Sequence, residues 1–558
     1  MQIIVPMSGF GERFRRAGYA VPKPLIEIEG KPIVAHVIDL FPGETDFLFI
    51  CNQDHLDNPE YRMAEILNQY CPTGKIVGIP PHKLGPVHAV LQVEDLIKGD
   101  APAVVNYCDF TCYWDWPHFK KFALDSQALG IIPAYKGFHP HTLGTTNYAY
   151  IREGRGRVID IQEKQPYTNN RMEEYASSGT YYFSSGNVLK DAFHRTVAEG
   201  LNTGGEYYVS LTYKPLLADG ENVQIYALQH FMQWGTPEDV TEYNEWSKIF
   251  KRLLLSEPSE ALDEIDSLVV PMAGLGQRFA NEGYKLTKPL IPVSGRAMAV
   301  QAILDLPRAK HRICVVRSDM SGRDDIADEL SKVWPEVVIH DLASVTEGQA
   351  ISALAGVASL RQELGIYPTD VTFGACDNGV LYDRESLRRL MSDPEVDVIV
   401  WGARGHNNAL RNPCMFGWIR EDCGKVKEVS VKVPLSDPAT DPIVIGAFTF
   451  KKVEYFERCV AGLIGGNVRV NGEFYIDSCV NEAVAAGLNC VLFEVDHFIS
   501  WGTPNDLKTF EYWQSCFHKW PTHPYDLSKD ARVPPAAVRQ LGSTYASFQR
   551  SEVEVVPK

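Results

Sequence analysis

The sequence predicts an α/β protein made of two tandem domains, each built on a doubly wound sheet of mixed or mostly parallel strands. The stretch 5–26, VPMSGFGERFRRAGYAVPKPLI, recurs at 270–291 as VPMAGLGQRFANEGYKLTKPLI. Seven of the first ten residues are identical, and the offset of 265 holds through Lys23 and Lys288. A repeat this long is a duplicated domain and not a solenoid unit. After each copy, short apolar runs alternate with helical patterns, which is typical of doubly wound sheets.

Bulk composition narrows the class of protein. The 558 residues carry a net charge of -17 and are 45% hydrophobic, as expected of a globular protein with large cores. This acidity disfavours nucleic acid or an anionic membrane as a partner. The 12 cysteines form no CxxC pair, and neither a signal peptide nor an apolar run of membrane-spanning length is visible. We therefore expect core thiols in a reducing compartment and a cytoplasmic protein.

The repeat also predicts the domain boundaries. We expect domain 1 at residues 1–250, a linker at 251–266 containing a Ser-Glu-Pro-Ser break, and domain 2 at 267–517. The segment 518–558 is rich in Pro, Ser and Asp and has no counterpart after the first copy. It is interpreted as a tail along the outside, with a homo-oligomer contact as the alternative.

The first copy begins with a predicted phosphate-binding loop. The run Gln2–Met7 predicts a strand buried on both faces. Gly9 and Gly11 follow, and glycines there let a phosphate approach backbone N–H groups. Arg13 adds fixed charge, and Lys23 lies between two prolines that hold the backbone extended. These features indicate an anion site.

Further elements follow in the order of a doubly wound sheet. We expect a helix at 32–40, a strand at 46–51, a helix at 58–70 and a strand at 75–79. Gly85 precedes another helix, whose first N–H groups are free to bind a base or phosphate. The run Ala103–Phe110 predicts a central strand that ends on Asp109. Ligands bind at such strand ends, and Mg²⁺ favours one or two carboxylates plus substrate phosphates.

Together these motifs resemble a known family. The G-x-G-x-R-F turn, the Pro-Lys-Pro, Asp109 and the pair Glu163-Lys164 resemble sugar-1-phosphate nucleotidyltransferases (NDP-sugar pyrophosphorylases) over about residues 1–250. The resemblance implies the Rossmann-like fold of the nucleotide-diphospho-sugar transferase type. It also implies transfer of a nucleotide from an NTP to a sugar phosphate, with pyrophosphate released and Mg²⁺ as cofactor. The segments NYCDF and WGTPEDV, with Gly179 between them, look like the branch of capsule and surface-polysaccharide pathways.

The resemblance also implies roles for individual residues. It implies catalytic roles for Arg13, Lys23, Asp109 and Lys164, nucleotide contacts at Met7, Ser8, Gly9, Gly11 and Gly85, acceptor contacts at Glu163 and Gly179, and a metal ligand at Asp109. For the second copy it implies nucleotide contacts at Met272, Ala273, Gly274, Gly276, Arg278, Lys288, Gly348 and Gln349, acceptor contacts at Lys432 and Gly446, and a metal ligand at Asp377.

Two departures from the family pattern bear on function. Many members carry a second metal-binding Asp where this chain has Gln233 and, in the second copy, Ser500. Either the metal keeps more water or another acid, such as Asp239 or Glu206, supplies the ligand. The second copy also has Val431 where the first has Glu163, although Lys432 is kept. Domain 2 is therefore either a second transferase for another acceptor or a degenerate copy.

Other functions are compatible with parts of the pattern. A cytidylyltransferase for a polyol, choline or amino-acid-derived phosphate would use the same fold with changed pocket walls. A nucleotide-binding regulator without turnover is an alternative of a different class. A dinucleotide-binding dehydrogenase is disfavoured, because the turn is G-x-G-x-R and no acid follows at the ribose-binding distance. The sequence predicts neither the base nor the acceptor.

Overall fold

The computed structural model describes residues 1–145, 147–255 and 264–547. The chain divides into two compact units. Unit 1 comprises Met1–Lys248, Ser515–Pro524 and Gly542–Lys558, and unit 2 comprises Ile249–Gln514 and Tyr525–Leu541. Half of the linker predicted at 251–266 falls on residues 256–263, which lie outside the described residues. Among the described residues, no helix is both long enough and apolar enough to cross a membrane.

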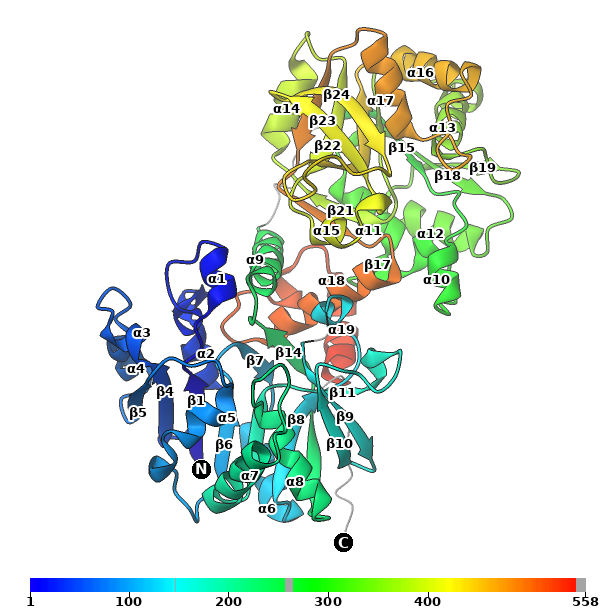
Figure 1. The fold of residues 1–558 in the computed structure, drawn as a ribbon. Helices are drawn as coiled ribbons and strands as arrows, with labels where there is room; N and C mark the ends of the chain where they lie inside the picture. The colour runs from blue at the N-terminus through cyan, green and yellow to red at the C-terminus, as the bar shows by residue number, and fades with distance from the viewer. Residues whose placement is uncertain (146, 256–263, 548–558) are drawn as a thin grey trace. The chain divides into compact units, whose positions relative to one another are not determined.

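Unit 1 is built on a ten-stranded mixed sheet (Figure 1). Its strands run in the spatial order β11 (Tyr175–Ser177), β9 (Ala149–Gly154), β10 (Arg157–Glu163), β13 (Val223–Leu228), β8 (Gly130–Tyr135), β12 (Thr180–Phe183), β6 (Ala103–Asn106), β1 (Gln2–Met7), β4 (Phe47–Asn52) and β5 (Lys75–Ile79). The strands β6, β1, β4 and β5 pair in parallel, and β12 lies antiparallel between β6 and β8. A further pairing of β11 with β8 closes the strands at the other end into a ring.

The central strand β1 explains why the sheet is covered on both faces. Ile3, Val5 and Met7 belong to one hydrophobic core, whereas Ile4 belongs to the other. Successive side chains of a strand point to opposite faces, so a continuous apolar run requires a core on each side. The prediction of a strand buried on both faces is confirmed.

Helices of unit 1 connect these strands. They are α1 (Glu12–Arg16), α2 (Ile33–Asp39), α3 (Gln53–Asp57), α4 (Met63–Tyr70), α5 (Pro86–Leu91), α6 (Trp116–Ser126), α7 (Gly186–Ala198), α8 (Tyr213–Ala218) and the greater part of α9 (Pro237–Arg252). Two small sheets pair β2 (Glu27–Ile28) with β3 (Lys31–Pro32) and β7 (Phe110–Tyr113) with β14 (His230–Gln233). The helix predicted at 58–70 begins only at Met63, because Arg62 takes a left-handed conformation with φ 48°.

Unit 2 repeats the topology. Its strands run in the order β19 (Val338–Leu342), β18 (Ala309–Arg317), β15 (Ile265–Pro271), β20 (Val371–Phe373), β25 (Ile443–Phe450), β22 (Val398–Ala403), β26 (Cys490–Glu494), β24 (Lys425–Val431) and β23 (Gly417–Asp422). This is the strand order of unit 1 read from β5, with β25 standing for both β12 and β11. The predicted fold class, an α/β protein with two similar mixed sheets, is confirmed.

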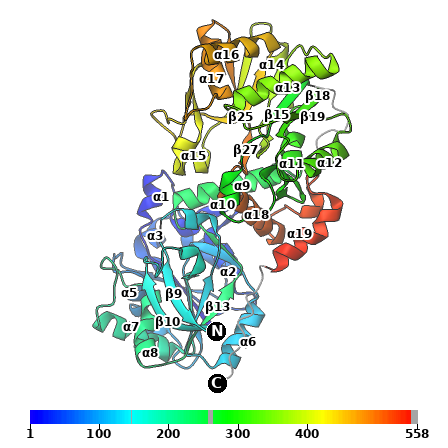
Figure 2. The same ribbon diagram turned by 90° about the vertical axis from the view of Figure 1, so that its right-hand side faces the viewer.

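The helices of unit 2 cover its sheet in the same way. They are α10 (Gln277–Asn281), α11 (Met298–Asp305), α12 (Arg323–Val333), α13 (Gln349–Leu364), α14 (Arg384–Ser392), α15 (Asn407–Arg411), α16 (Val453–Gly465), α17 (Ile476–Ala485), and parts of α18 (Pro504–Lys519) and α19 (Pro535–Ser547). Small sheets pair β16 (Pro292–Val293) with β17 (Arg296–Ala297) and β21 (Asn378–Leu381) with β27 (His497–Ser500). The helices α13, α16 and α17 gather on one face of the sheet (Figure 2).

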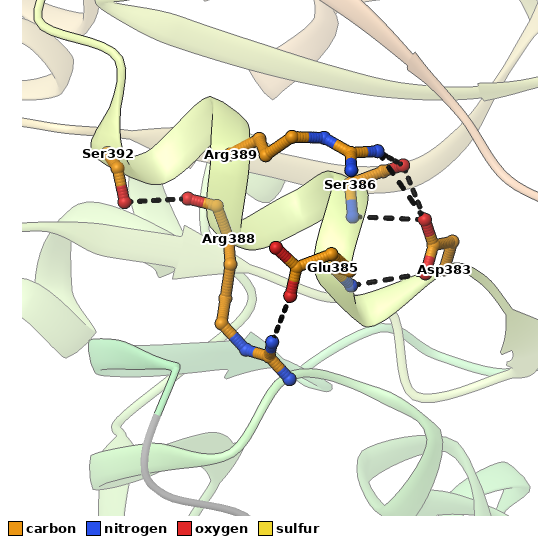
Figure 3. Close-up of polar contacts among 6 residues, drawn as sticks. All are labelled: Asp383, Glu385, Ser386, Arg388, Arg389 and Ser392. Carbon is orange, nitrogen blue, oxygen red and sulfur yellow. Dashed lines mark hydrogen bonds and ion pairs between the residues drawn. The ribbon is translucent and has the colours of Figure 1, made fainter.

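The amphipathic helix α14 shows how local sequence fixes a helix start (Figure 3). The carboxylate of Asp383 accepts hydrogen bonds from the backbone N–H groups of Glu385 and Ser386, at 3.2 and 3.1 Å. An acidic N-cap satisfies N–H groups that have no partner within the helix. Arg388 then pairs with Glu385 one turn earlier.

Candidate active site

A cavity of about 660 Å³ in unit 1 gathers the residues that the sequence predicted. It lies beyond the carboxyl end of β1 and the segment that follows β6, where open α/β sheets bind ligands. Its lining includes all the predicted first-copy residues: Met7, Ser8, Gly9, Gly11, Arg13, Lys23, Gly85, Asp109, Glu163, Lys164 and Gly179. The volume is within the range of small-molecule sites, roughly 300–1,000 Å³.

The glycine loop leaves its backbone open to this cavity. Gly11 is the N-cap of α1 and has φ 62°, a conformation that side chains disfavour. A Cβ added at Gly9 would meet no described atom within 4 Å. At these two glycines no side chain covers the loop backbone, which lines the cavity.

Gly85 is fixed by packing against the segment of Tyr207. With φ 88° and ψ 175°, Gly85 occupies a region that is essentially restricted to glycine. A Cβ there would lie 2.7 Å from both the backbone N and O atoms of Tyr207. The same two atoms of Tyr207 form hydrogen bonds to the residues on either side of Gly85. The N–H of Tyr207 donates to the carbonyl of Leu84 at 2.9 Å, and the N–H of Val87 donates to the carbonyl of Tyr207 at 3.1 Å. Gly85 thus ties the start of α5 to the GEYY segment.

The centre of the cavity carries an ion pair between Lys23 and Asp109. Lys23 Nζ lies 2.9 Å from Asp109 Oδ2, and both side chains are 26% exposed, so a ligand can reach them. Burial is the largest single effect on Lys23 and lowers its pKa, but the charge and hydrogen bond of Asp109, together with Cys108, raise the pKa overall. Lys23 therefore stays protonated near neutral pH.

The position of Asp109 differs from the expectation. It does not end a strand, because β6 stops at Asn106 and β7 begins at Phe110. Asn106 Oδ1 accepts a hydrogen bond from Thr180 Oγ1 at 2.6 Å, and the backbone of Tyr107 bonds to Gly179. The chain then turns, and Asp109 lies in the turn facing the cavity.

A second cationic group is held by a tyrosine and a glutamate. Lys164 Nζ donates to Tyr208 Oη at 2.6 Å, and Tyr208 Oη donates to Glu206 Oε2 at 2.7 Å. Lys164 follows β10 with φ 60°, an uncommon conformation for a residue with a side chain. Such conformations cluster at functional sites. Glu206 and Tyr208 also line the cavity.

Glu163 provides a carboxylate beside this lysine. Its Oε2 atom accepts a hydrogen bond from Ser210 Oγ at 2.6 Å. Burial raises the pKa of Glu163, and the bond from Ser210 opposes that shift. A carboxylate next to a fixed ammonium group suits a ligand that carries both a phosphate and a hydroxyl.

The residues around Asp109 fit a magnesium ion. Gln233 lines the cavity, and a Cβ at Gly235 would lie 3.2 Å from Asp109 Oδ2 and 3.3 Å from Gln233 Nε2. The same Nε2 donates to Asp239 Oδ2 at 2.7 Å, an oxygen that also accepts from Thr236 Oγ1 at 2.8 Å.

In this arrangement the side-chain nitrogen of Gln233 has a hydrogen-bond partner, whereas its side-chain oxygen has none among the described residues. Gln233 Oε1 is buried and has no hydrogen-bond partner in the described part of the chain. Among the described residues, no group of three or more His, Cys, Asp or Glu side chains forms a metal site. One carboxylate and one amide oxygen, completed by phosphates and water, is a set that Mg²⁺ accepts. Of the other acids considered, Glu206 lines the cavity, whereas Asp239 lies behind Gln233.

Unit 2 has a smaller cavity of about 250 Å³ in the matching place. Its lining includes Arg278, Lys288, Gln349, Asp377, Lys432 and Gly446 of the predicted residues. Met272, Ala273, Gly274, Gly276 and Gly348 are not among the residues that line it. Gly348 instead adjoins the backbone of Phe474, 2.5 Å from an added Cβ.

The polar pairs of unit 1 recur in unit 2. Lys288 forms an ion pair with Asp377 and donates to the carbonyl of Gly502 at 3.2 Å. Lys432 has φ 60°, like Lys164, and donates to Tyr475 Oη at 2.6 Å. Ser500, at the place of Gln233, donates to Asp506 at 3.2 Å.

Several lining residues were not singled out from the sequence. Tyr208 and Tyr475 hold the two lysines, and the repeated GEYY and GEFY segments were the available signal. Gln233 was noted only as a missing acid. Asp477, which lines the second cavity, was overlooked, although it lies two residues after the end of GEFY.

Comparisons with known proteins agree with the first half of the chain. The family model described as nucleotidyl transferase matches residues 3–244. The mannose-1-phosphate guanylyltransferase catalytic subunit beta of Dictyostelium discoideum is 25% identical over 194 residues, 33% of this chain and 50% of that protein. A mannose-1-phosphate guanyltransferase of Neurospora crassa is 24% identical over 245 residues, 43% of this chain and 62% of that protein. The chain thus spans about half to three fifths of these relatives.

A solved structure provides a further comparison. The nucleoside-diphosphate-sugar pyrophosphorylase from Vibrio cholerae RC9 is 21% identical, with a TM-score of 0.36, and the match covers 43% of this chain and 98% of that one. The predicted likeness of the first half to nucleotidyltransferases is confirmed by the family match over residues 3–244.

Proposed function

We propose that this chain, whose first half matches the nucleotidyl transferase family, joins an NTP to a sugar phosphate in the cavity of unit 1. The products are an NDP-sugar and pyrophosphate. The observation that carries the proposal is one cavity that holds an open glycine loop, the Lys23–Asp109 pair and the Lys164–Glu163 pair. Two separate cationic groups suit two phosphorylated substrates.

In this reaction an oxygen of the acceptor phosphate attacks the α-phosphorus of the NTP. The bond from that phosphorus to the oxygen bridging to the β-phosphorus breaks, and pyrophosphate leaves with the electron pair. The acceptor phosphate is already an anionic nucleophile, so no general base is required. Transfer at phosphorus then depends on positioning and on neutralising charge.

Each side chain has a proposed part in that positioning. Arg13 and the glycine-loop N–H groups hold the phosphates that become pyrophosphate. Lys23 stabilises charge at the α-phosphate, and Lys164, oriented by Tyr208, holds the acceptor phosphate. Glu163 accepts a hydrogen bond from an acceptor hydroxyl. Mg²⁺, held by Asp109 and Gln233 when bound, supplies further neutralisation of the phosphate charge.

We also propose the biosynthetic pathway that uses the product. The NYCDF and WGTPEDV segments support surface-polysaccharide synthesis as the destination of the product, and an NTP-consuming step of this kind fits a cytoplasmic enzyme.

A direct assay tests the function. The full chain is incubated with Mg²⁺, each of the four NTPs and a panel of sugar 1-phosphates, and pyrophosphate release is measured. Asp109→Asn is expected to lower the rate by about 100-fold or more, the scale for losing one charge-stabilising group. Asp125→Asn, an exposed carboxylate on α6, is the matched control and is expected to leave the rate unchanged. Absence of release with every pair would refute the proposal.

A further inference from the structure

Unit 2 keeps the lysine of the acceptor site but has moved the carboxylate. In unit 1, Glu163 on β10 is the cross-strand partner of Ala149 on β9. In unit 2 the corresponding partners are Val431 on β24 and Gly417 on β23. Val431 lines the cavity of unit 2, so the position of the lost acid still faces the site.

A different element restores an acid at that place. Ser210 follows Tyr208 by two residues, and Asp477 follows Tyr475 by two residues. Ser210 donates to Glu163 at 2.6 Å, which shows that these two positions adjoin in the fold. Asp477 lines the second cavity itself, together with Val431.

The backbone has made room for this acid. A Cβ on Gly417 would lie 2.4 Å from Asp477 Oδ1, far inside a normal contact. The matching residue in unit 1 is Ala149, which carries that Cβ beside the smaller Ser210. Three positions therefore differ together between the units. The acid is lost at Val431 on β24 and gained at Asp477 on α17, and Gly417 on β23 leaves space for the new side chain. Simple decay of an unused site would remove the acid without preparing space for another.

Burial and nearby donors act in opposite directions on the charge of Asp477. Burial raises the pKa of Asp477 to about 6, with its own backbone N–H and Lys432 opposing the shift. The group is therefore mostly ionised at neutral pH. A buried carboxylate is costly unless donors satisfy it, and the cavity is where a ligand hydroxyl can do so.

Three positions of the second cavity carry apolar side chains where the first carries hydroxyl groups. Val444 and Ile445 precede Gly446, whereas Ser177 and Ser178 precede Gly179. Phe416 stands where unit 1 has Tyr148, since the lysine that follows each hairpin donates its N–H to the carbonyl of that residue. Without these three hydroxyl groups, the acceptor end of the second cavity offers fewer hydrogen-bond partners, which favours an acceptor with few hydroxyl groups.

We infer that unit 2 is a second nucleotidyl-transfer site, in which Asp477 binds a hydroxyl of a phosphomonoester that carries fewer hydroxyl groups than a hexose phosphate. The inference rests on the function proposed for unit 1, because it assigns the same step to the repeated set. The acceptor phosphate attacks the α-phosphorus, the bond to the bridging oxygen breaks, and pyrophosphate leaves. Lys432 and Asp377 take the parts given to Lys164 and Asp109.

Two single-site variants of the full chain separate the two sites. Asp109→Asn disables unit 1 and Asp377→Asn disables unit 2, and pyrophosphate release is measured with Mg²⁺, the four NTPs, hexose 1-phosphates and short polyol phosphates. We expect a polyol phosphate whose turnover persists in Asp109→Asn and is lost in Asp377→Asn. Hexose 1-phosphate turnover is expected to behave in the opposite way.

The role of Asp477 is then measured in the Asp109→Asn background. Asp477→Asn is expected to raise KM for the polyol phosphate about 10- to 100-fold, as for loss of one hydrogen bond to a charged group, with KM for the NTP within about twofold. Asp422 is an exposed carboxylate at the far end of β23, and Asp422→Asn is the control. It should change neither the KM for the polyol phosphate nor the KM for the NTP. The triple variant Val431→Glu, Asp477→Ser, Gly417→Ala rebuilds the arrangement of unit 1. Its KM for the polyol phosphate should lie between that of Asp477→Asn and that of the Asp109→Asn parent.

The outcomes distinguish this inference from the proposed function. If Asp377→Asn retains hexose turnover while Asp109→Asn releases no pyrophosphate with any acceptor, unit 1 functions as proposed and the second site does not exist. If polyol turnover persists but Asp477→Asn leaves its KM unchanged in a folded protein, the assignment of Asp477 is wrong. The Asp109 and Asp377 variants decide the existence of the site even if Asp477→Asn does not fold.

Discussion

The substitution Gly85→Ala tests whether Gly85 is needed for the stability of the fold, in contrast to a glycine that is needed only for ligand binding. At φ 88° and ψ 175° an alanine costs roughly 1–3 kcal/mol in backbone strain. The new Cβ, 2.7 Å from two backbone atoms of Tyr207, adds a crowding cost of about 1–3 kcal/mol. The expected loss in free energy of unfolding is therefore about 2–6 kcal/mol. At about 2–4 °C per kcal/mol for a unit of this size, Tm falls by at least about 4 °C.

The assay is thermal unfolding followed by tryptophan fluorescence, with and without NTP and Mg²⁺. Gly9→Ala is the matched control, because its Cβ meets no described atom within 4 Å and Gly9 has no positive φ. We expect Gly9→Ala to melt within about 1 °C of the parent chain but to lose stabilisation by NTP, since bound ligand raises Tm by mass action. If Gly85→Ala melts like the parent, or if Gly9→Ala melts as low as Gly85→Ala, the reasoning from backbone geometry is refuted.

Three further outcomes follow from the cavity of unit 1. Tyr208→Phe removes the acceptor that orients Lys164, so KM for the sugar phosphate should rise about 10-fold while KM for NTP is unchanged; equal changes in both would contradict this part. Lys23→Met should lower kcat by about 100-fold or more in steady-state kinetics and leave the fold intact, and a near-normal kcat would exclude Lys23 from the transfer step. Burial raises the pKa of Asp239 to about 6 from 3.8, so the folded chain binds this proton more tightly and stability falls as pH rises from about 4 to 6. Asp239→Asn should remove of the order of 3 kcal/mol of that dependence in chemical denaturation, whereas an unchanged pH profile would show that Asp239 titrates normally.

Features set by short-range pattern were predictable from the sequence. The apolar run at Gln2–Met7 is β1 to the residue, and Lys75–Ile79 is β5. The duplication predicted two similar sheets, and the strand orders agree. Every first-copy residue assigned to the site lines one cavity, and several of them, such as Ser8, Gly9 and Lys164, lie just after a strand of the sheet.

Features set by contacts distant in sequence were not predictable. Asp109 was expected to end a strand, since the apolar run continues to Phe110. The strand ends at Asn106 instead, where a side-chain bond to Thr180 and a backbone bond at Gly179 fix the turn. The relocated acid of unit 2 required β23, β24 and α17 to be seen side by side, and no local pattern relates Gly417 to Asp477.

The repetition of one sheet within one polypeptide has a consequence for the cell. Translation of this chain makes the two cavities in a ratio of one to one, whatever the level of expression. If both cavities catalyse the reactions proposed for them, their relative output cannot be adjusted by gene dosage or by degradation of one of them. It is set by the rate constants of each cavity and by the supply of each acceptor, so selection on product balance acts directly on residues such as Glu163 and Asp477.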